Sequence, residues 1–286
     1  MKLIRDEDEI IRLYGEVDLV LDWSRQGVFD RCRFEAYMGY ELGFDSEGVT
    51  SDALEFGTRF HKHVETMDEK VWDGFKEEPS FTRDNRIKSK GVALGKLYIE
   101  HYLGWDTGKY KHIGWERAYG VVIDVDGRSV LVKGHIDQLM KDKETGLYWI
   151  KDLKTTAMYV DEKNYFSPWF LGGQGGYYSW LVGLEYGEEN IGGVIVDVAM
   201  VNKKETDESC IKRKIMESQE INWQGVVEVA RDWLRVKDRN VWRRSESSCV
   251  RYNKLCPFYL PCRHGVTDYW INQAKLRRKE NNEWHR

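Results

Sequence analysis

The sequence predicts an α/β (α+β) fold in which helices flank a small mixed sheet. Three observations predict it: apolar residues recur at helical spacing up to about residue 102, alternate as in strands over 115–154, and then follow helical and strand patterns in turn. Hydrophobic residues make up 41% of the 286 positions, which is enough for a sizeable core, and no Pro-rich or Gly/Ser-rich linker divides the chain. We therefore expect one domain over residues 1–286.

Three helices are expected before the first strand. The first covers about residues 24–42 and has Ser24 as its N-cap. The second covers about residues 51–72, because apolar residues form a stripe along one of its faces. The third covers about residues 86–102.

Three strands, at residues 115–125, 129–140 and 147–154, are expected to follow one another in a meander. Turn-forming pairs, Asp126-Gly127 and Thr145-Gly146, separate them. The later elements are a helix at 171–184, a strand at 193–201, a short strand at 210–216 and an amphipathic helix at 220–237.

The residues with the clearest chemistry lie on the second and third strands. Asp137 is near the end of one, and Asp152 and Lys154 are two positions apart on the next. Because residues i and i+2 of a strand share a face, Asp152 and Lys154 project together, and a hairpin can bring Asp137 beside them. Two carboxylates grouped in this way favour a hard divalent cation as their partner. The alternative is a solvated Asp–Lys pair on an outer face, but the apolar run before Asp152 indicates a buried strand.

These residues resemble a known family. Gly134-His135-Ile136-Asp137 followed by Asp152-Leu153-Lys154-Thr155 resembles the core of the PD-(D/E)XK nuclease superfamily, specifically its RecB-like branch. Gly57–His61 resembles the Gly-x-x-x-His motif of that branch, and Gln174–Tyr178 resembles its Gln-x-x-x-Tyr motif. Glu116 lies where the branch often has a glutamate. The four motifs occur in the order that the branch has.

The resemblance implies a restriction-endonuclease-like core, with its catalytic part at residues 115–201. The metal ligands that it implies are one imidazole, two carboxylates and a main-chain carbonyl, those of His61, Asp137, Asp152 and Leu153. The catalytic residues that it implies are the two acidic ligands, a lysine that acts as base or charge stabiliser, and two residues that shape the wall beside the DNA: Asp137, Asp152, Lys154, Gln174 and Tyr178. Nitrogen and oxygen ligands suit Mg²⁺ or Mn²⁺.

Three further side chains lie close to these motifs. Glu65 follows His61 by one helical turn and could add a weak metal ligand. His135 precedes Asp137 by two residues and could contact a phosphate. His63 is expected at the surface.

Four of the five cysteines have a one-plus-three layout: Cys32, Cys249, Cys256 and Cys262. This layout is similar to that of the iron–sulfur subset of RecB-like nucleases, including AddB and the exonucleases that accompany CRISPR adaptation. The resemblance implies a [4Fe–4S] cluster that joins residues 24–50 to residues 240–265. The alternatives are Zn²⁺ on the same four thiolates and reduced thiols. The subset has a Cys-x-x-Cys pair where six residues separate Cys249 from Cys256, and Cys210 lies outside the pattern.

Together these patterns predict a metal-dependent DNA nuclease. The resemblance favours an exonuclease acting on single strands or duplex ends, although the chemistry fits an endonuclease equally well. No Walker A motif is present, so a helicase, recombinase or CRISPR-adaptation protein would be a separate partner. The rival hypotheses are a catalytically silent DNA-binding or scaffold module of the same fold, and a structural Fe–S or Zn protein.

The charge pattern sets weaker limits. A net charge of −4 argues against a protein that coats nucleic acid non-specifically, but it allows a local basic groove, for which residues 88–96, 203–214 and 235–244 are candidates. No apolar run approaches membrane-spanning length and the first residues lack a signal-peptide core, so we expect a cytoplasmic protein without membrane contact. Residues 276–280 are expected to be a frayed tail.

Overall fold

The computed structural model describes residues 2–46, 52–75, 87–161, 165–166, 173–201, 206–217, 223–251 and 254–279. The chain divides into two compact units. Unit 1 contains Met1–Val49, Gly120–Lys133 and Gln224–Arg286, and unit 2 contains Thr50–Tyr119 and Gly134–Trp223. The prediction of a single nuclease domain stays a prediction. None of the helices within the described residues is long and apolar enough to cross a membrane.

Unit 2 is built on a mixed sheet, as predicted. Its strands lie in the order β4-β5-β6-β7-β8, and β4 and β5 continue into unit 1. Strand β6 pairs antiparallel with β5 and parallel with β7, and β7 pairs antiparallel with β8. The strands are β4 (Tyr110–Val125), β5 (Arg128–Asp142), β6 (Tyr148–Thr156), β7 (Ile191–Met200) and β8 (Ile211–Glu217).

The predicted turns between these strands are present. Asp126 and Gly127 have φ of 55° and 80°, the two left-handed conformations that a tight two-residue hairpin requires. Gly146 has φ of 73° in the turn between β5 and β6. The three strands expected as a meander are therefore neighbours in the sheet. Strands β4 and β5 are longer than expected by a few residues, and β6 is longer by one.

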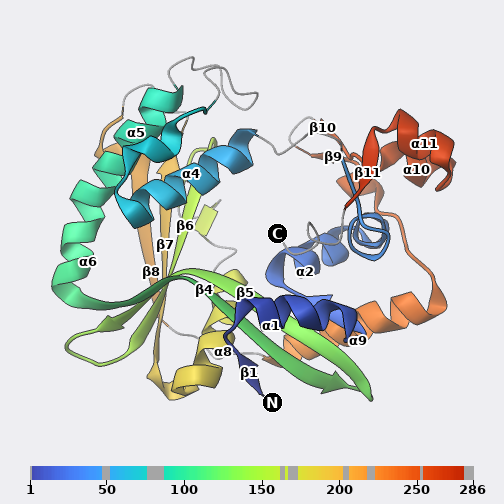
Figure 1. Cartoon of the computed structure of the whole chain (residues 1–286), viewed down its shortest axis with the longest axis horizontal. Coiled ribbons are helices and arrows are strands. Elements are labelled where there is room, and N and C mark those ends of the chain that lie inside the picture. Colours follow the sequence, from blue (N-terminus) through green and yellow to red (C-terminus); the bar gives the residue numbers. More distant parts are fainter. Residues whose placement is uncertain are drawn as a thin grey trace. The chain divides into compact units, whose positions relative to one another are not determined.

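Helices α4 and α5 cover one face of the sheet in unit 2 (Figure 1). Phe56, Phe60 and Val64 recur at every fourth residue of α4 and pack with Leu94 of α5 and Leu153 of β6, all 2% exposed or less. Helix α8 packs on the opposite face, where Gly175 lies against Val194 of β7. The helical elements of unit 2 are α4 (Asp52–Thr66), η3 (Glu69–Trp72), α5 (Ile87–Tyr98), η4 (Ile99–Leu103), α6 (Gly104–Lys109), α8 (Gln174–Tyr186), η6 (Glu188–Asn190) and η7 (Glu208–Cys210).

A buried network of charged groups lies on the α5 face of this sheet. Lys151 Nζ is 2.6 Å from Asp106 and 3.5 Å from Asp197, and Arg213 binds both carboxylates. The Tyr98 hydroxyl donates to Asp197 at 2.5 Å. Burial by itself would raise the pKa of Asp197, but Lys151 and Arg213 outweigh that effect and lower it. The two cations therefore neutralise the two carboxylates inside the core.

Unit 1 holds the remaining elements. Within it β1 pairs with β4, and β2 pairs parallel with β5. Its strands are β1 (Leu3–Ile4), β2 (Leu19–Leu21), β3 (Phe44–Ser46), β9 (Val250–Arg251), β10 (Lys254–Leu255) and β11 (Leu276–Arg278). Its helical elements are α1 (Glu7–Arg12), η1 (Leu13–Gly15), α2 (Trp23–Arg31), α3 (Arg33–Ala36), η2 (Tyr37–Glu41), α9 (Trp223–Arg239), η8 (Glu246–Ser248), α10 (Tyr259–His264) and α11 (Asp268–Gln273).

Two predictions about unit 1 were wrong. The first helix is capped by Asp22, whose carboxylate accepts from Arg25 N, instead of by Ser24, and it is interrupted at Cys32, which is extended. The expected tail at 276–280 begins as strand β11, which pairs with β3, and Leu276 is only 4% exposed because it packs with Phe34 and Met38. Glu280 lies outside the described residues.

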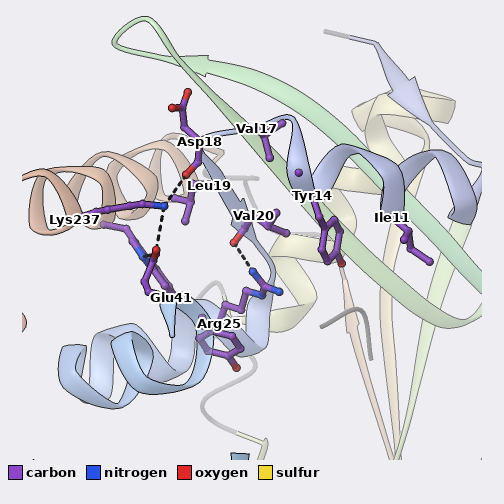
Figure 2. Close-up of a pocket in the computed structure, with 12 residues that line it drawn as sticks. Ile11, Tyr14, Val17, Asp18, Leu19, Val20, Arg25, Glu41 and Lys237 are labelled. Atoms are coloured by element: carbon purple, nitrogen blue, oxygen red, sulfur yellow. Dashed lines mark hydrogen bonds and ion pairs between the residues drawn. The ribbon is translucent and has the colours of Figure 1, made fainter. Parts of the chain in front are cut away.

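Unit 1 also contains a cavity of about 450 Å³, shown in Figure 2. On its wall the Arg25 guanidinium lies 4.9 Å from the ring of Tyr40 and donates to the carbonyl of Val20 at 3.3 Å. Lys237 of α9 is 3.0 Å from Glu41. The charged groups of the wall thus hold α9 against η2 and α2 against β2.

The network in unit 2 leads to a prediction about stability. We expect Asp197→Asn to lower the free energy of unfolding by about 3–5 kcal/mol, because it leaves Lys151 and Arg213 buried with one carboxylate in place of two. Urea unfolding followed by tryptophan fluorescence measures this change. Asp73→Asn, which removes the exposed partner of Lys88, is the matched control and should leave the unfolding curve almost unchanged. Equal curves for the two variants would contradict the prediction.

Candidate active site

Asp152 and Lys154 form a close ion pair on the α8 face of β6. Lys154 Nζ lies 2.8 Å and 3.0 Å from the two carboxylate oxygens of Asp152, and Asp152 is 1% exposed. Burial raises the pKa of Asp152 to about 6, and Asp137 adds to the rise while Lys154 opposes it. For Lys154, burial alone would lower the pKa, but Asp152 and Asp137 raise it well above its ordinary value. Lys154 is therefore held as a cation.

Asp137 joins β5 to β6 at this point. Its Oδ2 atom accepts a hydrogen bond of 2.7 Å from the main-chain N–H of Leu153. The same oxygen is 3.7 Å from Nδ1 of His61 on α4. Asp137 thus contacts both the histidine of the helix and the strand that carries the Asp152–Lys154 pair.

A group of three side chains in unit 2 could hold a metal ion. One ligand atom each of His61, Glu116 and Asp137 lies within 4.8 Å of the other two. Donors on opposite sides of Mg²⁺ are about 4.2 Å apart, so small movements would close this set around an ion. One imidazole nitrogen and two carboxylates suit Mg²⁺ or Mn²⁺. The residues therefore fit a divalent cation.

Glu116 is the member of this group to which the sequence assigned no chemistry of its own. Its φ is 46°, a left-handed conformation that residues other than glycine seldom adopt. Its carboxylate also lies 2.9 Å from Nδ1 of His135. Such a conformation at a candidate site indicates that the position of this side chain is under constraint. Among the described residues, Glu116 is thus the third member of the group that could hold an ion, and Asp152 next to it is paired with Lys154.

Gln174 and Tyr178 of α8 lie next to the Asp152–Lys154 pair. They are one helical turn apart, and Gln174 Nε2 donates to the Tyr178 hydroxyl at 2.7 Å. Burial raises the pKa of Tyr178, and the charge of Asp152 raises it further. The Gln-x-x-x-Tyr motif therefore forms the α8 side of the candidate site.

Two other side chains near the motifs, Glu65 and His63, contact residues outside the candidate site. Glu65 pairs with Lys62 at 2.8 Å. His63 was expected at the surface, which is wrong: it is 1% exposed and Nδ1 accepts a 3.0 Å hydrogen bond from the Trp72 indole. Burial lowers the pKa of His63, which favours this neutral acceptor form. Side chains two positions apart on a helix differ by about 200° in direction, so His61 and His63 face opposite sides.

The predicted basic groove receives little support in unit 2. Lys88 and Lys96 pair with acidic residues, at 3.3 Å from Asp73 and 2.8 Å from Glu69. Arg213 belongs to the buried network. Lys203 and Lys204 lie outside the described residues.

The four cysteines of the predicted cluster all belong to unit 1. Cys32, Cys256 and Cys262 are half-buried against an apolar cluster that contains Phe34 and Phe258. Burial raises the pKa of the Cys256 thiol to about 11, and Cys32 and Cys249 raise it further. Within the described residues, no three of these sulfurs lie within 4.8 Å of one another, so no tight cysteine cluster is formed.

The unusual spacing between Cys249 and Cys256 has a structural explanation. Strands β9 and β10 pair antiparallel between them, with Leu255 opposite Val250. Cys256 N then donates to the carbonyl of Cys249 at 2.7 Å. A hairpin therefore makes these two cysteines neighbours despite the six residues between them. Cys210 is fully buried in the core of unit 2, apart from this set.

One comparison with known protein families agrees with the motifs. The sequence profile described as the PD-(D/E)XK nuclease superfamily matches residues 23–263. The crystal structure of SSO0001 is similar with a TM-score of 0.42 and 14% identity, over 91% of this chain and 95% of that one. A "Putative exonuclease" from Eubacterium rectale has a TM-score of 0.47 and 15% identity, over 84% and 92% of the two chains. No curated protein sequence matches the chain significantly.

The ligand group leads to a prediction about which substitution weakens metal binding. We expect Glu116→Gln to weaken Mn²⁺ binding roughly tenfold or more, because it removes one of the two carboxylates of the group. Titration calorimetry or Mn²⁺ electron paramagnetic resonance measures the affinity without any turnover.

The matched control is Glu65→Gln, a change of the same kind on α4. It should bind Mn²⁺ like the unchanged protein because Glu65 is paired with Lys62. If Glu65→Gln loses affinity and Glu116→Gln does not, the ligand group is wrong.

Proposed function

The chain belongs to the PD-(D/E)XK nuclease superfamily, and we propose that it hydrolyses the phosphodiester bonds of DNA with a divalent metal ion. The observation that carries the proposal is the grouping at one end of β6. Residues from α4, β4, β5, β6 and α8, which are far apart in the sequence, come together there: His61, Glu116, Asp137, Asp152, Lys154, Gln174 and Tyr178.

We assign the metal to His61, Glu116 and Asp137, with Asp152 and the carbonyl of Leu153 as further ligands. When bound, Mg²⁺ or Mn²⁺ would polarise the phosphate and lower the pKa of an attacking water. A metal ion would also compensate the negative charge that Asp137 and Asp152 place next to one another.

Lys154 has a distinct role in this proposal. As water attacks phosphorus and the sugar oxygen leaves, negative charge grows on the phosphate oxygens. The Lys154 ammonium, held by Asp152 at 2.8 Å, is placed to offset that charge or to orient the water. Tyr178 and Gln174 would shape the neighbouring wall and restrict where Lys154 can point.

Exonuclease activity on single strands or duplex ends is our preferred form of the reaction. Its support is the order of the sequence motifs, which is that of the RecB-like branch. A helicase, recombinase or CRISPR-adaptation protein would then supply or extend the DNA end as a separate partner. A catalytically silent DNA-binding module of the same fold is the rival, and a turnover experiment separates the two.

We also propose that Cys32, Cys249, Cys256 and Cys262 hold a [4Fe–4S] cluster. The support is that all four belong to unit 1 and that the β9–β10 hairpin makes Cys249 and Cys256 neighbours. A cluster spreads its four thiolate ligands farther apart than a single ion does. It would join residues 24–50 to residues 240–265 and so have a structural role.

The nuclease assignment predicts metal-dependent cleavage that needs Lys154. Protein purified without oxygen should degrade DNA with Mn²⁺ and not with EDTA. Lys154→Ala should cleave at least about 100-fold more slowly, because it removes a group that stabilises transition-state charge. Single strands, duplexes and end-blocked forms of each are the substrates.

Lys62→Ala is the control, since Lys62 is an exposed lysine paired with Glu65 on α4. It should cleave like the unchanged protein. A folded wild type that cleaves none of these substrates would favour the silent binding module. Cleavage of end-blocked DNA would show that the protein is an endonuclease and not an exonuclease.

The cluster assignment predicts iron and sulfide in the isolated protein. We expect about four iron atoms per chain and visible absorbance after purification without oxygen. Cys256→Ser should lose both, whereas Cys210→Ser should keep them because Cys210 lies in the core of unit 2. Zinc in place of iron, or no bound metal, would overturn the cluster.

A further inference from the structure

Exposed side chains follow directly after strand β6, which ends two residues beyond the Asp152–Lys154 pair. Ala157, Met158 and Tyr159 are consecutive and exposed. Tyr159 is 71% exposed, more than any other large hydrophobic side chain in the described residues, and Met158 is 52% exposed. A single exposed apolar side chain is common on protein surfaces. Whether Met158 and Tyr159 have a function therefore depends on what lies next to them.

The backbone on both sides of the pair is held in place. The carbonyl of Thr156 accepts from Val201 N at 2.8 Å, and its hydroxyl accepts from Met158 N at 3.0 Å. Val160 on the other side is 3% exposed. Met158 and Tyr159 are therefore presented outward by a short segment that is anchored at both ends.

The candidate active site is close along the chain. Tyr159 follows Lys154 by five residues, so their Cα atoms are at most about 18 Å apart even in a fully extended chain. A side chain at this distance can reach the nucleotides next to the one that is cut.

Helix α4 adds a third exposed apolar side chain at the same edge. Leu54 is 63% exposed and precedes His61 by seven residues, which places both on one helix face. Gly57 lies between them, and a Cβ atom there would be 3.2 Å from the hydroxyl of Thr155. The first half of α4 is therefore packed against the end of β6, so Leu54 belongs to the edge that carries Met158 and Tyr159.

We propose that Tyr159, Met158 and Leu54 form a stacking surface for unpaired bases of the DNA strand that is cut. This inference rests on the proposed nuclease function. Aromatic rings stack on every base, so such contacts tolerate any sequence, whereas the bases of an intact duplex are covered by their neighbours. The surface would select single strands and frayed ends. Three side chains are too few for a protein interface, which buries about 800 Å² on each partner.

Binding of a labelled oligonucleotide tests this surface. In the Lys154→Ala background, so that DNA is not consumed, Tyr159→Ala should bind single-stranded DNA roughly 5- to 150-fold more weakly. Tyr159→Phe keeps the ring and should bind within about twofold of the parent, a rescue expected of stacking. A 2-aminopurine base next to the labelled end should lose fluorescence on binding the parent and not on binding Tyr159→Ala.

Two controls test whether a loss of binding is specific to Tyr159 and to unpaired bases. Tyr269→Ala removes a tyrosine of unit 1 that is 61% exposed, and it should leave binding unchanged. A relaxed, covalently closed circular duplex has no ends and no unpaired bases, so Tyr159→Ala should bind this closed duplex like the parent. Unchanged single-strand affinity, an equal loss on the closed duplex, or failure of Tyr159→Phe to restore binding would each overturn the proposal.

The proposed nuclease function is tested in the same preparations by cleavage with Mn²⁺ in the Lys154-containing protein. If that protein cleaves DNA and Tyr159→Ala binds normally, only the stacking surface is wrong. If it does not cleave, the nuclease function fails, and the binding series still decides whether the surface stacks on bases.

Discussion

The buried network of Lys151, Asp106, Asp197 and Arg213 is the constraint on which the candidate site depends. Strand β6 is covered on both faces, and its side chains alternate between them. Lys151 and Leu153 enter the α4–α5 face, which leaves Asp152 and Lys154 for the α8 face. A slip of one residue would bury Asp152 beside Asp197 and turn Lys151 toward α8. The network penalises that slip heavily, because it would set two carboxylates together in the core.

The candidate site places groups together that are costly for folding. Burial and Asp137 raise the pKa of Asp152, and Glu116 is held in a left-handed conformation. A folded core that is well fixed elsewhere can tolerate such costs, and they are typical of sites with a function. The apolar packing of α4 against β6 and the charged network together provide that support. The same packing brings His61 to Asp137.

Unit 1 uses different means to keep distant segments together. Leu276 of β11 packs with Phe34 of α3, and β11 pairs with β3. Cys32, Cys256 and Cys262 pack against this apolar cluster. The proposed iron–sulfur cluster would add covalent links to contacts that already join the two ends of the unit. Loss of the cluster would therefore affect the stability of the fold more directly than the cleavage reaction.

Local patterns in the sequence determined much of the core. Alternation and the Asp126-Gly127 turn were enough to predict β4, β5 and β6, and a period of two was enough to put Asp152 and Lys154 on one face. The order of motifs was enough to identify the superfamily. These features depend on residues that are close together in the chain, so they can be predicted from the sequence pattern.

Tertiary structure alone decided the rest. Glu116 joins His61 and Asp137 across separations of 55 and 21 residues, and no local pattern encodes that distance. The buried His63 accepts a hydrogen bond from the Trp72 indole. Arg213 lies in a segment that was predicted to line a basic groove, but it pairs with Asp106 and Asp197 in the core. Such outcomes depend on how distant elements pack, where each buried polar group must find its partner.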